Sequence, residues 1–179
     1  MKKKLPEPKL VPKTVPVVLV IDPASKSCGA AVFDLFGTPL QAFTLKSGLS
    51  NWGDRLADMR EQLESMLFYM RATHNYEVAE LVFERVPPAA HVGVPLVLGA
   101  LLSAEGMHKV DVRKDNAVSP STWKAWARAE GCPDKDPKGI PGLEHLMKNN
   151  AKIEPPPPDS DDAADALMIG MSWFARHPF

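Results

Sequence analysis

Residues 15–21 form a short apolar run that constrains the fold of this chain more than any other stretch. The run is rich in β-branched residues and ends at Asp22-Pro23, which cannot continue a regular element. A run of this length and composition, bounded by a turn signal, is typical of a buried strand. We therefore expect residues 15–21 to be the central strand of a sheet.

The order of the elements expected after this strand limits the topology of that sheet. Turn signals separate further short apolar runs, and one long segment has apolar residues spaced three and four apart, as in an amphipathic helix. We expect strands over residues 30–33, 41–45, 80–85 and 109–113, and helices over 51–74, 95–107, from 119, 143–149 and 161–176. A meander of three strands followed by β-α units predicts an α/β fold, a mixed five-stranded sheet with helices on both faces.

Charge is unevenly distributed along the 179 residues of the chain. The chain carries a net charge of -1, but its first fourteen residues hold five lysines and one glutamate, five minus one or +4, among several prolines. This composition predicts a disordered, basic, proline-rich arm over residues 1–14 and a single folded domain over 15–179. No apolar run reaches the length of a membrane span, and we expect no membrane partner. The two isolated cysteines favour the reducing cytoplasm.

A dense group of acids near the C-terminus follows the four prolines of residues 155–158. Because Asp162 and Asp165 are three residues apart, they share one face of the expected final helix. Several carboxylates in one first turn repel each other, and the helix dipole offsets only part of that repulsion. Two interpretations stay open at this point, a solvated acidic turn and a site for a divalent cation.

Two further acids stand at the ends of expected strands, Asp22 after the first and Glu84 at the end of the fourth. If these strands are neighbours and the last helix packs over them, all four carboxylates converge on one spot. A site made only of carboxylates selects Mg²⁺ or Mn²⁺ rather than zinc, and two such ions can promote phosphodiester hydrolysis. The alternative for Glu84 is an ion pair with Arg85 or Lys26.

Three motifs carry a resemblance to a known family. They are Ile21-Asp22-Pro23-Ala24-Ser25 with Gly29 behind it, Phe83-Glu84-Arg85-Val86, and Asp162-Ala163-Ala164-Asp165-Ala166-Leu167. In this order and spacing they resemble the motifs of RuvC-type Holliday junction resolvases in the ribonuclease H-like superfamily, and we expect a member from a phage or virus. The likeness spans nearly all of residues 15–176.

The resemblance implies a ribonuclease H-like nuclease domain and a homodimer whose subunits make paired, symmetric nicks in a four-way DNA junction. The required ion would be Mg²⁺, for which Mn²⁺ can substitute. The catalytic, metal-binding carboxylates would be Asp22, Glu84, Asp162 and Asp165. Lys124 best fits the lysine that holds the backbone phosphate, and the helix over residues 95–107 falls where the family dimerises. The expected DNA-binding residues are Lys124, Arg128, Lys135 and Lys138, with solvated surface lysines as the alternative.

The sequence departs from the family pattern at two places. Ala24 replaces the usual glycine after Asp-Pro, which alters a turn and leaves the carboxylate in place. The aromatic residue that follows the second acid in the family is absent, because Pro87 and Pro88 stand there. His91 and Trp123 are the candidates to replace it. The change bears on substrate choice and keeps open a broader nuclease for branched DNA or RNA.

Two other protein classes fit the sequence less well. ATP-binding proteins of the sugar-kinase or actin type begin with a similar strand and hairpin, but they need a second phosphate-binding hairpin and a much longer chain. A DNA-binding or scaffold protein that keeps the fold without catalysis has no need for all four carboxylates.

Overall fold

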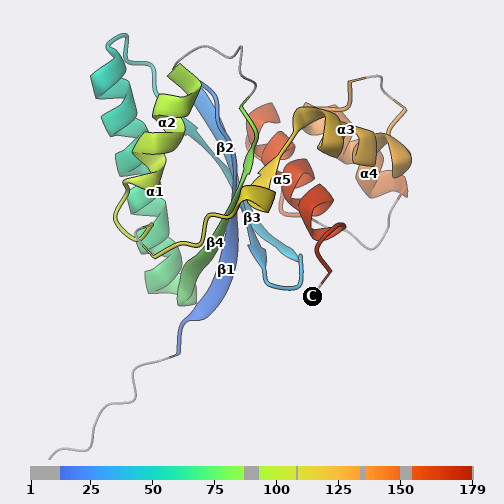
Figure 1. The fold of residues 1–179 in the computed structure, drawn as a ribbon, viewed down its shortest axis with the longest axis horizontal. Coiled ribbons are helices and arrows are strands. Elements are labelled where there is room, and N and C mark those ends of the chain that lie inside the picture. The colour runs from blue at the N-terminus through green and yellow to red at the C-terminus, as the bar shows by residue number, and fades with distance from the viewer. Residues whose placement is uncertain (1–12, 87–92, 108, 134–135, 150–154, 179) are drawn as a thin grey trace, which may run out of the picture.

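The computed structural model describes residues 13–86, 93–107, 109–133, 136–149 and 155–178. Within these ranges a five-stranded sheet forms the centre of the molecule, in the order β3-β2-β1-β4-β5 (Figure 1). The strands are β1 (Val15–Asp22), β2 (Ser27–Asp34), β3 (Pro39–Lys46), β4 (Tyr76–Glu84) and β5 (Ala117–Val118). The expected central strand is confirmed, because β1 lies in the middle and residues 17–21 are at most 1% exposed.

The pairing of β1 with its two neighbours positions two of the acids. β1 is antiparallel to β2, with Asp22 opposite Gly29, and parallel to β4, with Ile21 opposite Phe83. Asp22 and Glu84, the next residue on each parallel strand, therefore leave the sheet side by side at one edge. The meander of the first three strands and the mixed sheet are thus both confirmed.

Helices cover both faces of the sheet, as expected (Figure 1). One core cluster joins α1 and α2 to the sheet, and a second joins it to α3, α4 and α5. The helices are α1 (Trp52–His74), α2 (Gly93–Leu102), α3 (Pro120–Ala129), α4 (Gly139–Asn149) and α5 (Asp161–Phe174). No helix in the described ranges is both long enough and apolar enough to cross a membrane.

The fifth strand expected over residues 109–113 is wrong in position. In that segment only Asp111 bridges to β4, at Glu80, and β5 follows it at residues 117–118. Between them lies a short 3-10 helix, Lys114–Asn116. The Asn116 side chain donates a 2.9 Å hydrogen bond to the carbonyl of Leu81 and so replaces a bond of the strand ladder.

Two helix boundaries also differ from the expected ones. The helix expected over residues 95–107 ends at Leu102, and Gly106 in the turn behind it has a φ of 95°, which favours glycine. The helix expected over 143–149 begins four residues earlier, at Gly139. Its first amides donate to Asp161 and Asp165 of α5, a cap that comes from a distant part of the chain.

Most of the expected basic arm, residues 1–12, lies outside the described residues. At its end the carbonyl of Lys13 accepts a 2.7 Å hydrogen bond from the Asn75 side chain. Thr14 donates a 2.8 Å hydrogen bond to Glu77. The chain thus enters β1 beside the start of β4, at the end of the sheet opposite Asp22 and Glu84.

Candidate active site

The four predicted carboxylates come from three elements that meet at one edge of the sheet. Asp22 ends β1, Glu84 ends β4, and Asp162 and Asp165 lie in the first turns of α5. All four side chains are half-buried. Ser160 caps α5 by accepting a 3.1 Å hydrogen bond from the amide of Ala163.

Close packing between α5 and β2 fixes where the helical acids lie. A Cβ atom added to Gly29 would lie 1.8 Å from the backbone oxygen of Asp162, so only glycine permits this approach. Ala163 and Ala164, beside the acids, are completely buried against the sheet. Glycine in β2 and alanine in α5 therefore bring the helix start within reach of the strand ends.

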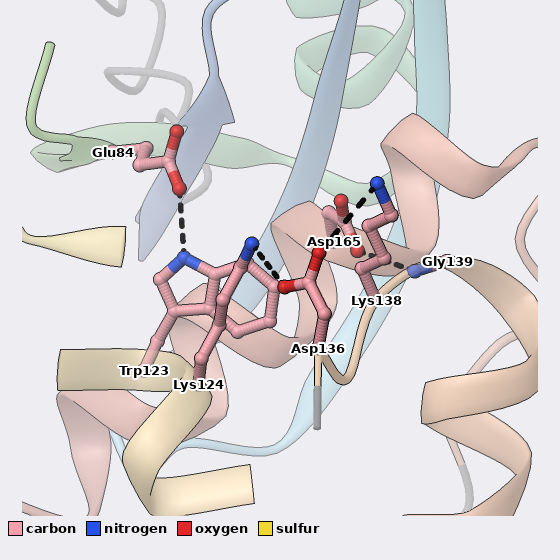
Figure 2. Close-up of polar contacts among 7 residues, drawn as sticks. All are labelled: Glu84, Trp123, Lys124, Asp136, Lys138, Gly139 and Asp165. Atoms are coloured by element: carbon pink, nitrogen blue, oxygen red, sulfur yellow. Dashed lines mark hydrogen bonds and ion pairs between the residues drawn. The ribbon is translucent and has the colours of Figure 1, made fainter. Parts of the chain in front are cut away.

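Three of the carboxylates accept hydrogen bonds from the surrounding chain. Asp162 Oδ2 accepts from the hydroxyl of Ser27. Figure 2 shows the other two: Glu84 Oε1 accepts from Trp123 Nε1 at 2.8 Å, and Asp165 Oδ1 accepts from the amide of Gly139 at 2.5 Å. These bonds restrict how each side chain can turn.

The electrostatics of the site show that the four acids act on one another. Burial raises the pKa of Asp22 to about 8, and the negative charges of Glu84, Asp165 and Asp162 add to this effect. Burial also raises the pKa of Asp165 to about 6, opposed by the Gly139 amide and by the charge of Lys124. The site therefore holds more negative charge than it can stabilise alone, and a proton or a cation must offset it.

The donor set fits hard divalent cations, because it consists of carboxylate oxygens in a partly buried cluster. Within the described part of the chain, no three His, Cys, Asp or Glu side chains already surround a common ion position. Charges act on one another over longer distances than the bonds between a metal ion and its ligands. The acids can therefore shift one another's pKa without surrounding a common ion position.

Trp123 is a partner of Glu84 that the sequence analysis did not identify. The alternative named there, an ion pair of Glu84 with Arg85 or Lys26, does not describe the bond that the structure has. A buried indole N–H needs an acceptor, and Glu84 supplies it. Trp123 is 1% exposed, so its suggested role as a replacement for the family's stacking aromatic is wrong for this conformation. The other candidate, His91, and Pro87 and Pro88 lie outside the described residues.

Lys124 and Lys138 lie beside the carboxylates, and both face Asp136 (Figure 2). Lys124 Nζ is 2.6 Å from Asp136 Oδ1, and Lys138 Nζ is 3.8 Å from Asp136 Oδ2. The charge of Arg128 also reaches Asp136, whereas Lys135 lies outside the described residues. Lys124 and Lys138 are thus grouped around Asp136, and the charge of Arg128 acts on the same carboxylate.

Arg55 is a second residue near the site that sequence reasoning missed. It is 7% exposed and donates hydrogen bonds to the carbonyls of Leu49, Ser50 and Ser25. Ser25 belongs to the turn that follows Asp22, so Arg55 ties this turn to the segment before α1. One feature of the sequence could have identified Arg55. It lies four residues before Met59, on the buried face of α1, where a charged side chain needs hydrogen-bond partners.

Comparisons with known proteins identify the fold. No family model and no curated protein matches the sequence. Among solved structures, the chain is similar to RuvC of T. thermophilus, determined in complex with a Holliday junction substrate. The two chains are 21% identical, with a TM-score of 0.60, and the match covers 90% of this chain and 95% of that one. The ribonuclease H-like α/β fold is therefore confirmed.

Proposed function

We propose that this protein is a metal-dependent endonuclease that resolves four-way DNA junctions by paired, symmetric nicks. The observation that carries the proposal is the convergence of four carboxylates, from β1, β4 and α5, at one sheet edge. The fold in which they converge is shared with a protein determined on a Holliday junction. The motif order from Asp22 to Asp165 supports the same assignment.

Each group at the site has a part in the proposed reaction. Asp22, Glu84, Asp162 and Asp165 would hold the metal ions, Mg²⁺ or Mn²⁺. When bound, such ions supply an activated water and charge stabilisation at the leaving oxygen. Ser27, Trp123 and the Gly139 amide restrain three of the carboxylates through the hydrogen bonds described above.

The basic residues beside the carboxylates would bind the DNA backbone. The charge of Lys124 acts on Asp165, and we propose that Lys124 contacts the phosphate next to the cleaved bond. Lys138, Arg128 and Lys135 would contact neighbouring phosphates. Contacts of this kind carry little sequence information, so junction selectivity would come from DNA shape.

Paired nicking requires two sites, and the exposed side of α2 is the proposed dimer surface. Leu96 in this helix is 50% exposed, and Pro95 and Gly99 beside it are exposed as well. We expect wild-type protein to sediment as a dimer and Leu96→Glu as a monomer, because a buried charge at the interface is costly. A monomeric wild type would contradict this assignment.

The test of the main proposal compares a four-way junction, a flap and a linear duplex in Mg²⁺, Ca²⁺ and EDTA. We expect symmetric nicks on the junction in Mg²⁺, binding without cleavage in Ca²⁺, and no cleavage in EDTA. Asp22→Asn should bind the junction and not cut it, whereas Asp115→Asn, an exposed acid outside the site, should cut normally. Cutting by Asp22→Asn would remove that residue from the mechanism.

A nuclease for broader branched DNA or RNA is the second candidate. It is favoured by one observation, that Trp123 is buried and cannot take the role of the missing stacking aromatic. Equal cutting of the flap and the junction would support this candidate over the resolvase. For either activity we propose the cytoplasm as the compartment, since both cysteines are free thiols.

A further inference from the structure

Asp136 lies between two of the basic residues beside the carboxylates. Its two carboxylate oxygens face different lysines, Oδ1 toward Lys124 at 2.6 Å and Oδ2 toward Lys138 at 3.8 Å (Figure 2). The side chain of Asp136 is 56% exposed, and that of Lys124 is 24% exposed. An anion approaching from solvent therefore meets a pair of lysines that already hold a carboxylate.

The contact resembles a lysine–phosphate contact in its chemistry. A carboxylate and a phosphodiester each offer anionic oxygens to an ammonium group at hydrogen-bond distance. The hydrogen bond and charge of Lys124, with smaller contributions from Lys138 and Arg128, lower the pKa of Asp136. The carboxylate thus stays ionised throughout the neutral pH range.

We propose that Asp136 competes with the DNA backbone for Lys124 and Lys138, so that a phosphate binds at this position by displacing the carboxylate. The inference rests on the proposed function, because it concerns the phosphate contacts of that same site. Asp136 thereby lowers the affinity for any polyanion that reaches the two lysines. A free anion with no other contacts to the protein displaces it least effectively.

The experiment measures binding of a labelled four-way junction to wild type and Asp136→Asn by fluorescence anisotropy in Ca²⁺. An exposed ion pair is weak, so we expect Asp136→Asn to bind the junction up to about fivefold more tightly than wild type. The slope of log affinity against log salt should steepen by up to about one, because no displaced carboxylate remains beside the phosphate.

A matched control separates this competition from a general change in net charge. Asp111→Asn also removes one negative charge from an exposed ion pair, since Asp111 is 2.6 Å from Arg113. Asp111 is paired with Glu80 of β4, which lies four residues before Glu84 in that strand. We expect Asp111→Asn to bind the junction like wild type. Urea unfolding of both variants checks that each one is folded.

A double-variant comparison tests whether Asp136 acts through Lys124. Replacing Lys124 by Gln should weaken junction binding. Adding Asp136→Asn to Lys124→Gln should raise the affinity less than twofold, because the ion pair between Lys124 and Asp136 is already lost.

Two results would overturn the inference. One is equal junction affinity of Asp136→Asn and Asp111→Asn, and the other is an undiminished gain in affinity from Asp136→Asn when Lys124 is replaced. If wild type binds the junction and Asp136→Asn is unchanged, only the inference fails. If wild type binds no junction, the proposed function fails with it.

Discussion

Replacing Asp22 by Asn should change how the stability of the metal-free protein depends on pH. Burial and the three neighbouring carboxylates raise the pKa of Asp22 to about 8 in the folded state, whereas the ordinary value is 3.8. The folded protein therefore keeps a proton that the unfolded chain releases. Stability from this group is fully present below the unfolded pKa and is lost as pH rises through the folded value.

The size of the effect follows from proton linkage. Each bound proton that unfolding releases lowers the free energy of unfolding by about 1.4 kcal/mol for each pH unit. Between pH 5 and pH 7, Asp22 alone should therefore lower the stability of the wild type by roughly 2–3 kcal/mol. Asp165, whose pKa is raised to about 6, should add a smaller loss in the lower part of this window.

The assay is urea unfolding in EDTA at several pH values from 5 to 8. Asp22→Asn, which has no carboxyl to ionise, should show the flatter profile and should be more stable than wild type near pH 8. Asp115→Asn serves as the control, because Asp115 is exposed in the 3-10 helix and distant from the cluster. Its profile should run parallel to that of the wild type. Saturating Mg²⁺ should stabilise the wild type at pH 8 far more than Asp22→Asn.

Parallel profiles for wild type and Asp22→Asn would refute the reasoning. That result would mean that Asp22 ionises as freely in the folded state as in the unfolded chain. The carboxylates would then not form the crowded, partly buried cluster on which the proposed metal site depends.

Two further substitutions test how the site is built. Gly29→Ala should cost about 1–3 kcal/mol of stability and abolish cleavage, because its Cβ would overlap the backbone of α5; Gly48→Ala, with open space around it, should be neutral in urea unfolding. Trp123→Phe keeps a ring but removes the N–H donor to Glu84, so Mg²⁺ affinity measured by calorimetry should fall about tenfold. The control is Trp126→Phe, since the Trp126 N–H has no hydrogen-bond partner within the described residues, and unchanged Mg²⁺ affinity in both variants would contradict the role of Trp123.

Local patterns were sufficient to predict most of the elements. The run of residues 15–21 and the spacing of apolar residues in 51–74 correspond to β1 and α1, because burial against one sheet imposes these periods on the sequence. Elements that are short or capped by distant residues were not predicted, because they depend on contacts between segments that are far apart in the sequence. β5 has only two residues and depends on its pairing with β4. The start of α4 depends on Asp165, which is 26 residues away in the chain.

The sequence by itself was sufficient to identify the acids of the candidate site. Asp22, Glu84 and the acids of α5 were recognisable because they stand at strand ends and near a helix start, and because the helix dipole offsets only part of so much negative charge. Their negative charges and their order along the chain pointed to a divalent metal and to one fold.

Only the tertiary structure decided what surrounds these acids. Ser27 meets Asp162 across 135 positions, Trp123 meets Glu84 across 39, and Lys124 of α3 meets Asp136 of the following loop. No period or local motif encodes such pairs, because they form only when α3, α4 and α5 pack on the same face of the sheet. The sequence therefore indicates the acids of the candidate site, and the packing of distant segments determines their hydrogen bonds and their pKa values.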